Sequence, residues 1–192
     1  MEYLANKLTN QLAKWQIVKE EDKELYAYGF WQGAVFILNI ITVVVAGVFF
    51  QMLWQSLIFM VAYGLIRSMA GGYHARTQRS CYILSIALIV SVLAILKWVS
   101  WSVLACLILL ASSVCSVFLW APVEDRNKPL DEIEQYVYKK RSRIIAVFLF
   151  VTAILFITIN QVEIASCISV SVAASAIMLI FGKISNYTYN QG

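Results

Sequence analysis

The stretch YAYGFWQGAVFILNIITVVVAGVFFQMLWQSLIFMVAYGLI, residues 26–66, decides the fold, because no Asp, Glu, Lys or Arg occurs in its 41 positions. A helix that crosses the hydrocarbon core of a bilayer needs about 20 apolar residues. Residues 26–66 are therefore long enough for two membrane spans. Further uncharged runs, each long enough for one span, follow at 80–96, 98–123, 144–162 and 164–182.

The composition of the whole chain is also that of a membrane protein. Of its 192 residues, 61% are hydrophobic and 14% are charged, whereas a water-soluble domain carries about 25% charged residues. Lipid offers no hydrogen-bond partner to the backbone, so spans must be helices or strands of a closed barrel. The apolar runs are continuous and lack the alternation of a barrel strand. We therefore predict an all-α polytopic protein with six transmembrane helices, near residues 28–49, 52–68, 82–96, 99–120, 144–161 and 164–182.

The segments outside the spans predict the organisation of the chain. Residues 1–27 are expected to form a cytoplasmic region with an amphipathic helix, because Leu4, Leu8, Leu12 and Trp15 share one helical face. Such a helix lies in the membrane interface or packs on cytoplasmic loops, and the interfacial position is favoured. The membrane domain covers residues 28–183 and includes a cytoplasmic loop at 121–143. Residues 184–192 are expected to form a cytoplasmic tail.

The basic residues predict the orientation in the membrane. With the N-terminus in the cytoplasm, 14 of the 15 Lys and Arg residues fall on the cytoplasmic side, and only Lys97 does not. Positive charge is enriched in cytoplasmic loops of membrane proteins. We therefore expect a multi-pass protein of the cell membrane with both termini in the cytoplasm. The basic residues then face anionic lipid, and no nucleic-acid partner is needed to explain them.

One segment, RSMAGGYHARTQRSC at residues 67–81, contains the residue types of a reaction centre. It includes the sole histidine of the chain, His74, and the cysteine Cys81. An imidazole beside a thiol is the minimum for nucleophilic catalysis by cysteine, because the thiolate is the attacking species. The glycines Gly71 and Gly72 allow backbone N–H groups to approach a reacting carbonyl, as an oxyanion hole requires. This segment is expected to lie at the cytoplasmic edge of the membrane.

The spacing between His74 and Cys81 predicts a break in the helix. In a straight helix, residues seven positions apart are separated by about 10.5 Å of rise, whereas a base and its nucleophile lie roughly 3 Å apart. We therefore expect the span to end at Gly71-Gly72. No acidic residue adjoins the motif, so a polar group would have to orient the imidazole, and the candidates are Gln78, Ser80 and Ser68.

A less specific interpretation of the same residues is a histidine that caps a helix end and a cysteine that fills space in a span. The cysteines Cys106, Cys115 and Cys167 lie in predicted spans and fit that description. One histidine and one cysteine are too few to bind zinc, which usually has four ligands. We expect no metal and no cofactor.

The motif resembles that of the accessory gene regulator B (AgrB-like) family, which are membrane cysteine endopeptidases of Gram-positive quorum sensing. The resemblance rests on Gly71-Gly72-Tyr73-His74-Ala75 with Cys81 and on Arg67, and it extends to Ala121-Pro122 and Asn127-Lys128 in the second loop. It implies that Cys81 is the nucleophile and His74 the general base. Arg67, Gly71 and Gly72 are then expected to support the site or bind substrate.

The resemblance also implies a substrate and a product. The substrate would be a short amphipathic propeptide at the inner membrane face, cleaved before its C-terminal tail and cyclised to a thiolactone or lactone autoinducing peptide. The resemblance implies a homodimer as well. An alternative function is that of a non-enzymatic membrane transporter or exporter of a small peptide. A transporter typically has ionisable residues or broken helices near the membrane midplane, and the uncharged predicted spans disfavour it.

Overall fold

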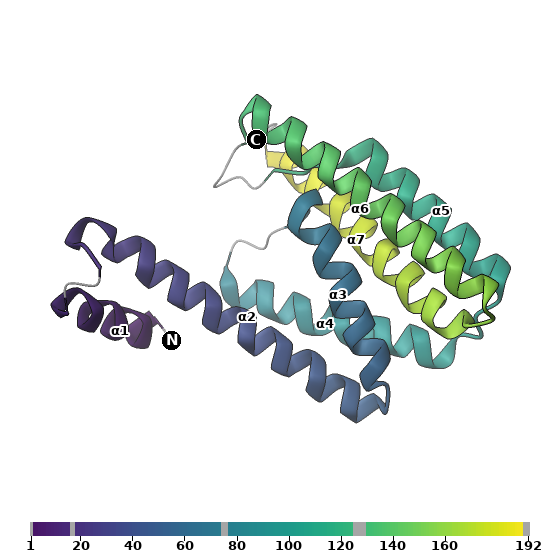
Figure 1. Ribbon diagram of the computed structural model, residues 1–192, viewed down its shortest axis with the longest axis horizontal. Helices are drawn as coiled ribbons and strands as arrows, with labels where there is room; N and C mark the ends of the chain where they lie inside the picture. The colour runs from purple at the N-terminus through teal and green to yellow at the C-terminus, as the bar shows by residue number, and fades with distance from the viewer. Residues whose placement is uncertain (1, 16–17, 74–76, 125–129, 190–192) are drawn as a thin grey trace. The chain divides into compact units, whose positions relative to one another are not determined.

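A computed structural model of the chain describes residues 2–15, 18–73, 77–124 and 130–189. These residues are all-helical, as predicted (Figure 1). Six of the helices, α2 to α7, are long and apolar enough to cross a membrane, which confirms the predicted number of spans. The elements are, in chain order, α1 (Glu2–Lys14), the 3₁₀ helix η1 (Glu20–Asp22), α2 (Lys23–Phe50), α3 (Leu53–Ala70), α4 (Gln78–Trp98), α5 (Val103–Trp120), α6 (Glu132–Thr158) and α7 (Val162–Tyr189).

The chain divides into two compact units, residues 1–42 and 43–192. The first unit holds α1, η1 and the first part of α2. Helix α1 covers the region predicted to be an amphipathic helix, and Leu8 and Trp15 expose 52% and 64% of their surface. These apolar side chains are available to lipid headgroups, and the interfacial position of α1 stays a prediction.

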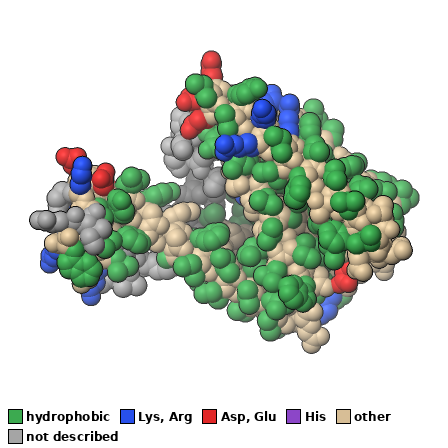
Figure 2. Space-filling view, viewed as in Figure 1, with side chains coloured by type: hydrophobic (Ala, Val, Ile, Leu, Met, Phe, Trp, Pro, Cys, Tyr) green, Lys and Arg blue, Asp and Glu red, His purple; other side chains and the backbone are tan. Residues whose placement is uncertain are grey.

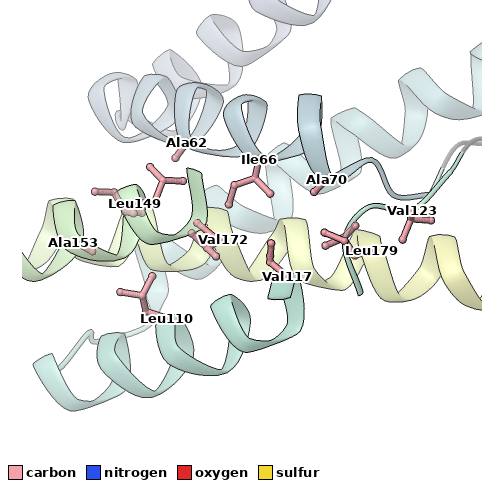
Figure 3. Packing of buried hydrophobic residues seen from close by; sticks show 13 residues of the cluster. Ala62, Ile66, Ala70, Leu110, Val117, Val123, Leu149, Ala153, Val172 and Leu179 are labelled. Atoms are coloured by element: carbon pink, nitrogen blue, oxygen red, sulfur yellow. The ribbon is translucent and has the colours of Figure 1, made fainter. Parts of the chain in front are cut away.

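Helix α7 is the central helix of the second unit. It contacts α3, α4, α5 and α6, and 78% of its most apolar stretch is buried inside the protein. Figure 3 shows Val172 and Leu179 of α7 among apolar side chains of α3, α5 and α6. A second cluster of buried apolar residues joins α7 to α4 and to the end of α2.

Small side chains explain why α7 can occupy the centre. Four serines of α7 are buried, and each donates its hydroxyl to a carbonyl of the same helix, three or four residues earlier. Their polar atoms are thus satisfied without a partner on another helix. Small residues also let neighbouring helix backbones approach closely within a membrane. The serines are Ser166, Ser169, Ser171 and Ser175.

Helix α6 begins at Glu132, well before the predicted span at 144–161, so the predicted loop 121–143 is partly helical. A capping box starts it: Asp131 accepts from the backbone of Glu134, and Glu134 accepts from the backbone of Asp131. Such a box satisfies N–H groups that the first helical turn leaves unpaired. The charges of this extension exclude it from an apolar run, so hydropathy gives the bounds of a span and not the start of the longer helix that contains it.

The surface of the second unit is largely apolar. Figure 2 shows hydrophobic side chains over its flanks, and Lys and Arg side chains gathered near the end where α6 begins. There Arg143 donates through Nη2 to the carbonyl of Phe118, at 3.0 Å, and its guanidinium lies over the Phe118 ring. A cation at the C-terminal end of α5 compensates the negative end of that helix. An apolar flank with charge at one end is the surface expected of a membrane bundle.

Candidate active site

The predicted break after the second span is present. Helix α3 ends at Ala70, and Gly71 follows with φ 70° and ψ −144°, a conformation that is essentially restricted to glycine. Gly72 also has a positive φ, of 129°. The two glycines therefore redirect the chain out of α3 before the histidine, as the spacing of His74 and Cys81 required.

Gly71 packs against the second loop of the chain. It forms a parallel bridge with Val123, and the Val123 N–H donates to the Ala70 carbonyl at 2.8 Å. A Cβ atom at Gly71 would overlap the Val123 carbonyl oxygen. The backbone contact thus requires glycine at position 71, and it joins two loops that lie about fifty residues apart in sequence.

The next two residues pack against α7. The Tyr73 N–H donates to the Met178 carbonyl at 2.9 Å. A Cβ atom at Gly182 would lie 2.7 Å from the Gly72 carbonyl carbon and 2.7 Å from the Tyr73 nitrogen. Gly182 therefore provides the space in which residues 72–73 cross α7, so the central helix of the bundle supports the candidate site.

Arg67, on α3, contacts both Gly72 and Tyr73. Its Nη2 atom donates to the Tyr73 carbonyl, and a Cβ atom at Gly72 would overlap its Nη1 atom. Nη1 is buried and has no hydrogen-bond partner among the described residues. Tyr73 is consequently held through both its N–H and its carbonyl, and Tyr73 is the residue directly before His74.

Cys81 lies in the first turn of α4. Thr77 caps this helix by accepting from the Ser80 N–H at 3.2 Å, and the Cys81 N–H donates to the Thr77 carbonyl at 3.0 Å. The thiol is free and half-buried. The N-terminal end of a helix carries partial positive charge, which stabilises an anion placed there. Cys81 therefore lies at the end of α4 whose partial charge is positive.

Tyr63 connects the two halves of the site and was not among the predicted residues. Its hydroxyl lies within electrostatic reach of both the Arg67 guanidinium and the Cys81 thiol. Tyr63 precedes Arg67 by four residues, so the two share one face of α3. The four-residue spacing was the only sign in the sequence that Tyr63 belongs to the site. Nothing in the sequence indicated that α4 would bring Cys81 near Tyr63.

Of the predicted site residues, Arg67, Gly71 and Gly72 are in mutual packing, and Cys81 is related to Arg67 through Tyr63. His74 lies outside the described residues, as do Asn127-Lys128 of the second loop. Two candidates for orienting the imidazole have local partners instead: Ser68 donates to the Leu65 carbonyl, and Ser80 shares a hydrogen bond with Thr77. The side chain of Gln78 is not described.

The remaining cysteines lie away from this segment. Cys106 and Cys167 are buried, and Cys115 is exposed on α5. Within the described ranges, no group of three His, Cys, Asp or Glu side chains is arranged to hold a metal ion.

Comparison with known proteins relates the chain to one family. The model of the family described as accessory gene regulator B matches residues 5–179. The chain is 24% identical over 140 residues to a provisionally named AgrB-like protein 2 of Clostridium perfringens strain 13, covering 68% of this chain and 65% of that protein. It is 22% identical over 160 residues to a provisionally named AgrB-like protein of C. perfringens strain SM101, covering 79% of this chain and 75% of that protein.

No solved structure matches the chain. The aligned region covers about two thirds of the first of these relatives. The family match, by contrast, includes α3, the glycine break, Cys81 and most of α7. With six apolar helices and a family match over most of its length, the chain is a multi-pass membrane protein that belongs to the accessory gene regulator B family.

Proposed function

We propose that this protein is a membrane cysteine endopeptidase that cleaves the C-terminal tail from a short quorum-sensing propeptide and promotes cyclisation of the remaining peptide. Membership of the accessory gene regulator B family supports a role in processing the autoinducer. The observation that carries the proposal is the placement of Cys81: a free, half-buried thiol in the first turn of α4, a helix that contacts both α3 and α7.

The first chemical step is acyl transfer to Cys81. His74 removes the proton from the thiol, and the thiolate attacks the carbonyl carbon of the scissile peptide bond. The C–N bond breaks, the amine of the C-terminal tail takes the proton from His74, and the propeptide is left as a thioester on Cys81. The N–H groups of Gly71 and Tyr73 already donate to the Arg67 and Met178 carbonyls, so the oxyanion that forms during this step takes other donors.

The second step is ring closure. A thiol or hydroxyl of the bound propeptide attacks the thioester carbonyl, the bond to Cys81 breaks, and the Cys81 thiol recovers its proton. The product is a thiolactone if the attacking group is a thiol and a lactone if it is a hydroxyl. The thioester retains the energy of the cleaved bond, so no nucleotide is required, but water must be kept from the intermediate.

Arg67 and the two glycines have a positioning role in this proposal. The bond from Arg67 to Tyr73 and the bond from Tyr73 to Met178 hold the backbone directly before the general base. The buried Nη1 atom of Arg67 has N–H groups to donate to a partner such as a carboxylate of the substrate tail. Homodimer formation stays a separate prediction.

Peptide export by this chain is the alternative prediction. The polar groups nearest the middle of α7 are serines, and their hydroxyls bond carbonyls of their own helix. Such hydroxyls do not by themselves line a path for a solute. This observation favours the peptidase over the transporter.

The experiment is co-expression of the full chain with a candidate propeptide, followed by mass spectrometry of the released tail and of the processed peptide. Cys81→Ala and His74→Ala should each abolish both products, since a general base or nucleophile is worth at least about a hundredfold in rate. Cys115→Ala is the matched control, because Cys115 is the exposed cysteine on α5, and it should process normally. Tail release by Cys81→Ala at the unsubstituted rate would overturn the proposal.

A further inference from the structure

A cavity of about 280 Å³ lies at the end of the bundle opposite the candidate active site. It is lined from the α2–α3 connection, α3, α4, the α4–α5 connection and the start of α7, by Met52, Gln55, Leu96, Trp101, Val162, Glu163, Ser166 and Cys167. Glu163 precedes Met178 by fifteen residues on α7, which corresponds to about 22 Å along the helix. The cavity is thus separate from the residues around Cys81.

Three hydrogen-bond acceptors face this cavity in fixed orientations. Gln55 donates its amide N–H to a carboxylate oxygen of Glu163, so the Gln55 carbonyl oxygen is left as an acceptor. Ser166 donates its hydroxyl to the Glu163 backbone carbonyl at 2.7 Å, which leaves its lone pairs free to accept. Glu163 adds a second carboxylate oxygen. A ligand group with three N–H donors and a positive charge complements these acceptors, and the buried Nε1 atom of Trp101, which has no hydrogen-bond partner among the described residues, offers one donor to an acceptor of the same ligand.

A primary ammonium group is the match to these acceptors. It has three N–H donors and one positive charge, and an aromatic wall such as Trp101 adds attraction to a cation. A quaternary ammonium carries the same charge but has no N–H to donate. The other lining side chains, Met52, Leu96 and Val162, are apolar and suit a carbon chain beside the ammonium.

A basic residue lies next to the cavity. Lys97 follows the lining residue Leu96, and its Nζ atom donates to the Phe50 carbonyl at 3.0 Å, close in sequence to the lining residue Met52. The connections between spans at this end lie near Gln51, Lys97 and residues 161–163. Their charged residues are Lys97 and Glu163. One anion and one cation together complement a zwitterion.

We infer that this cavity binds the headgroup of an ethanolamine phospholipid, with the ammonium at Glu163, Gln55 and Ser166 and the phosphodiester toward Lys97. The cavity lies at the ends of apolar helices, where lipid headgroups are the most abundant ligands. Trp54 and Trp98, at the same end, expose 76% and 74% of their surface, and exposed tryptophans are enriched at the headgroup level of membranes. The volume is at the lower limit of ligand sites, roughly 300 Å³, and fits a headgroup better than a larger molecule.

The test uses the full chain purified in a nonionic detergent and titrated with short-chain phosphatidylethanolamine, the matched phosphatidylcholine and free phosphoethanolamine. The ethanolamine lipid should bind about tenfold more tightly than the choline lipid, because only its ammonium can donate hydrogen bonds. It should also bind more tightly than phosphoethanolamine, which lacks acyl chains to pack on the helices. Equal binding of the two lipids, or equal binding of the lipid and the free headgroup, would overturn the assignment.

Two variants assign the binding to the cavity. Glu163→Gln keeps the shape of the side chain and its bond to Gln55 but removes the charge, and it should weaken binding of the ethanolamine lipid about tenfold with little effect on the choline lipid. Glu132→Gln, an exposed acid at the start of α6, is the control for net charge and should bind as the unsubstituted chain does. The inference fails if Glu163→Gln and Glu132→Gln bind the ethanolamine lipid equally well, or if Glu163→Gln weakens both lipids alike.

Discussion

At the scale of single residues, two glycines make room for the backbone at the candidate site. Gly71 and Gly72 have φ values of 70° and 129°, and a side chain at either would meet Val123 or Arg67. The polar contacts of Arg67 and Tyr73 form only because the backbone can pass through this space. Sequence reasoning predicted the break but not what occupies the space around it.

Gly72→Ala should therefore reduce peptide processing at least about tenfold and destabilise the fold by roughly 1–3 kcal/mol, because alanine is strained at this φ and its methyl group displaces the Arg67 guanidinium. The measurements are product yield and thermal unfolding in detergent. Gly64→Ala is the control, since a Cβ at Gly64 on α3 meets nothing within 4 Å. Equal activity of the two variants would show that the packing of Gly72 is unimportant.

At the scale of elements, α7 supports the segment that precedes His74. The Met178 carbonyl accepts from the Tyr73 N–H, and Gly182, one turn later, leaves room for residues 72–73. Helix α3 supplies Arg67 and Tyr63, and α4 supplies Cys81 at its first turn. Two consecutive helices, α3 and α4, and the distant helix α7 thus contribute to one site.

Gly182→Ala tests this role of α7. Its methyl group would lie 2.7 Å from backbone atoms of residues 72 and 73, which cannot rotate away as a side chain can, so the segment must shift. We expect a loss of processing with the protein still inserted in the membrane, and a destabilisation of about 1–3 kcal/mol, typical of overpacking. Gly64→Ala again serves as the control. Normal processing by Gly182→Ala would mean that residues 72–73 need not lie against α7.

At the scale of the whole molecule, the charge distribution predicts which end of the bundle faces the cytoplasm. The start of α6 lies at the same end of the bundle as the candidate active site, because the loop before α6 contacts that site through Val123. This part of α6 carries Lys139, Lys140, Arg141 and Arg143. The opposite end has short connections at Gln51 and Asn160, both with φ 60°. By the positive-inside rule the first end is predicted to face the cytoplasm.

Single cysteines introduced at exposed positions of a cysteine-free variant check this orientation. Glu132→Cys, at the start of α6, should react with a membrane-impermeant maleimide only after the cells are opened. Gln161→Cys, between α6 and α7, should react in intact cells. Labelling of Glu132→Cys from outside intact cells would reverse the topology and place the candidate active site on the outer face.

The sequence by itself determined the features that depend on local composition. Five uncharged runs, the first of them long enough for two spans, became six helices, because each span must satisfy its own backbone hydrogen bonds in lipid. Gly71-Gly72 ended α3, because only glycine adopts such φ values readily. Hydropathy did not predict the charged start of α6, although the residues of its capping box, Asp131 and Glu134, can be read in the sequence.

Only the tertiary structure decided which helix is central and what surrounds Cys81. The most apolar stretches of α4 and α7 have similar mean hydropathy, 2.2 and 2.3. Yet 22% of the stretch in α4 is buried, against 78% of the stretch in α7. Lipid is as apolar as a helix surface, so hydropathy does not distinguish a lipid-facing span from a buried one, and packing of small residues decides. The contacts of Tyr63, Val123 and Gly182 with the candidate site follow from that packing. They join residues that are too far apart in sequence for a local pattern to predict.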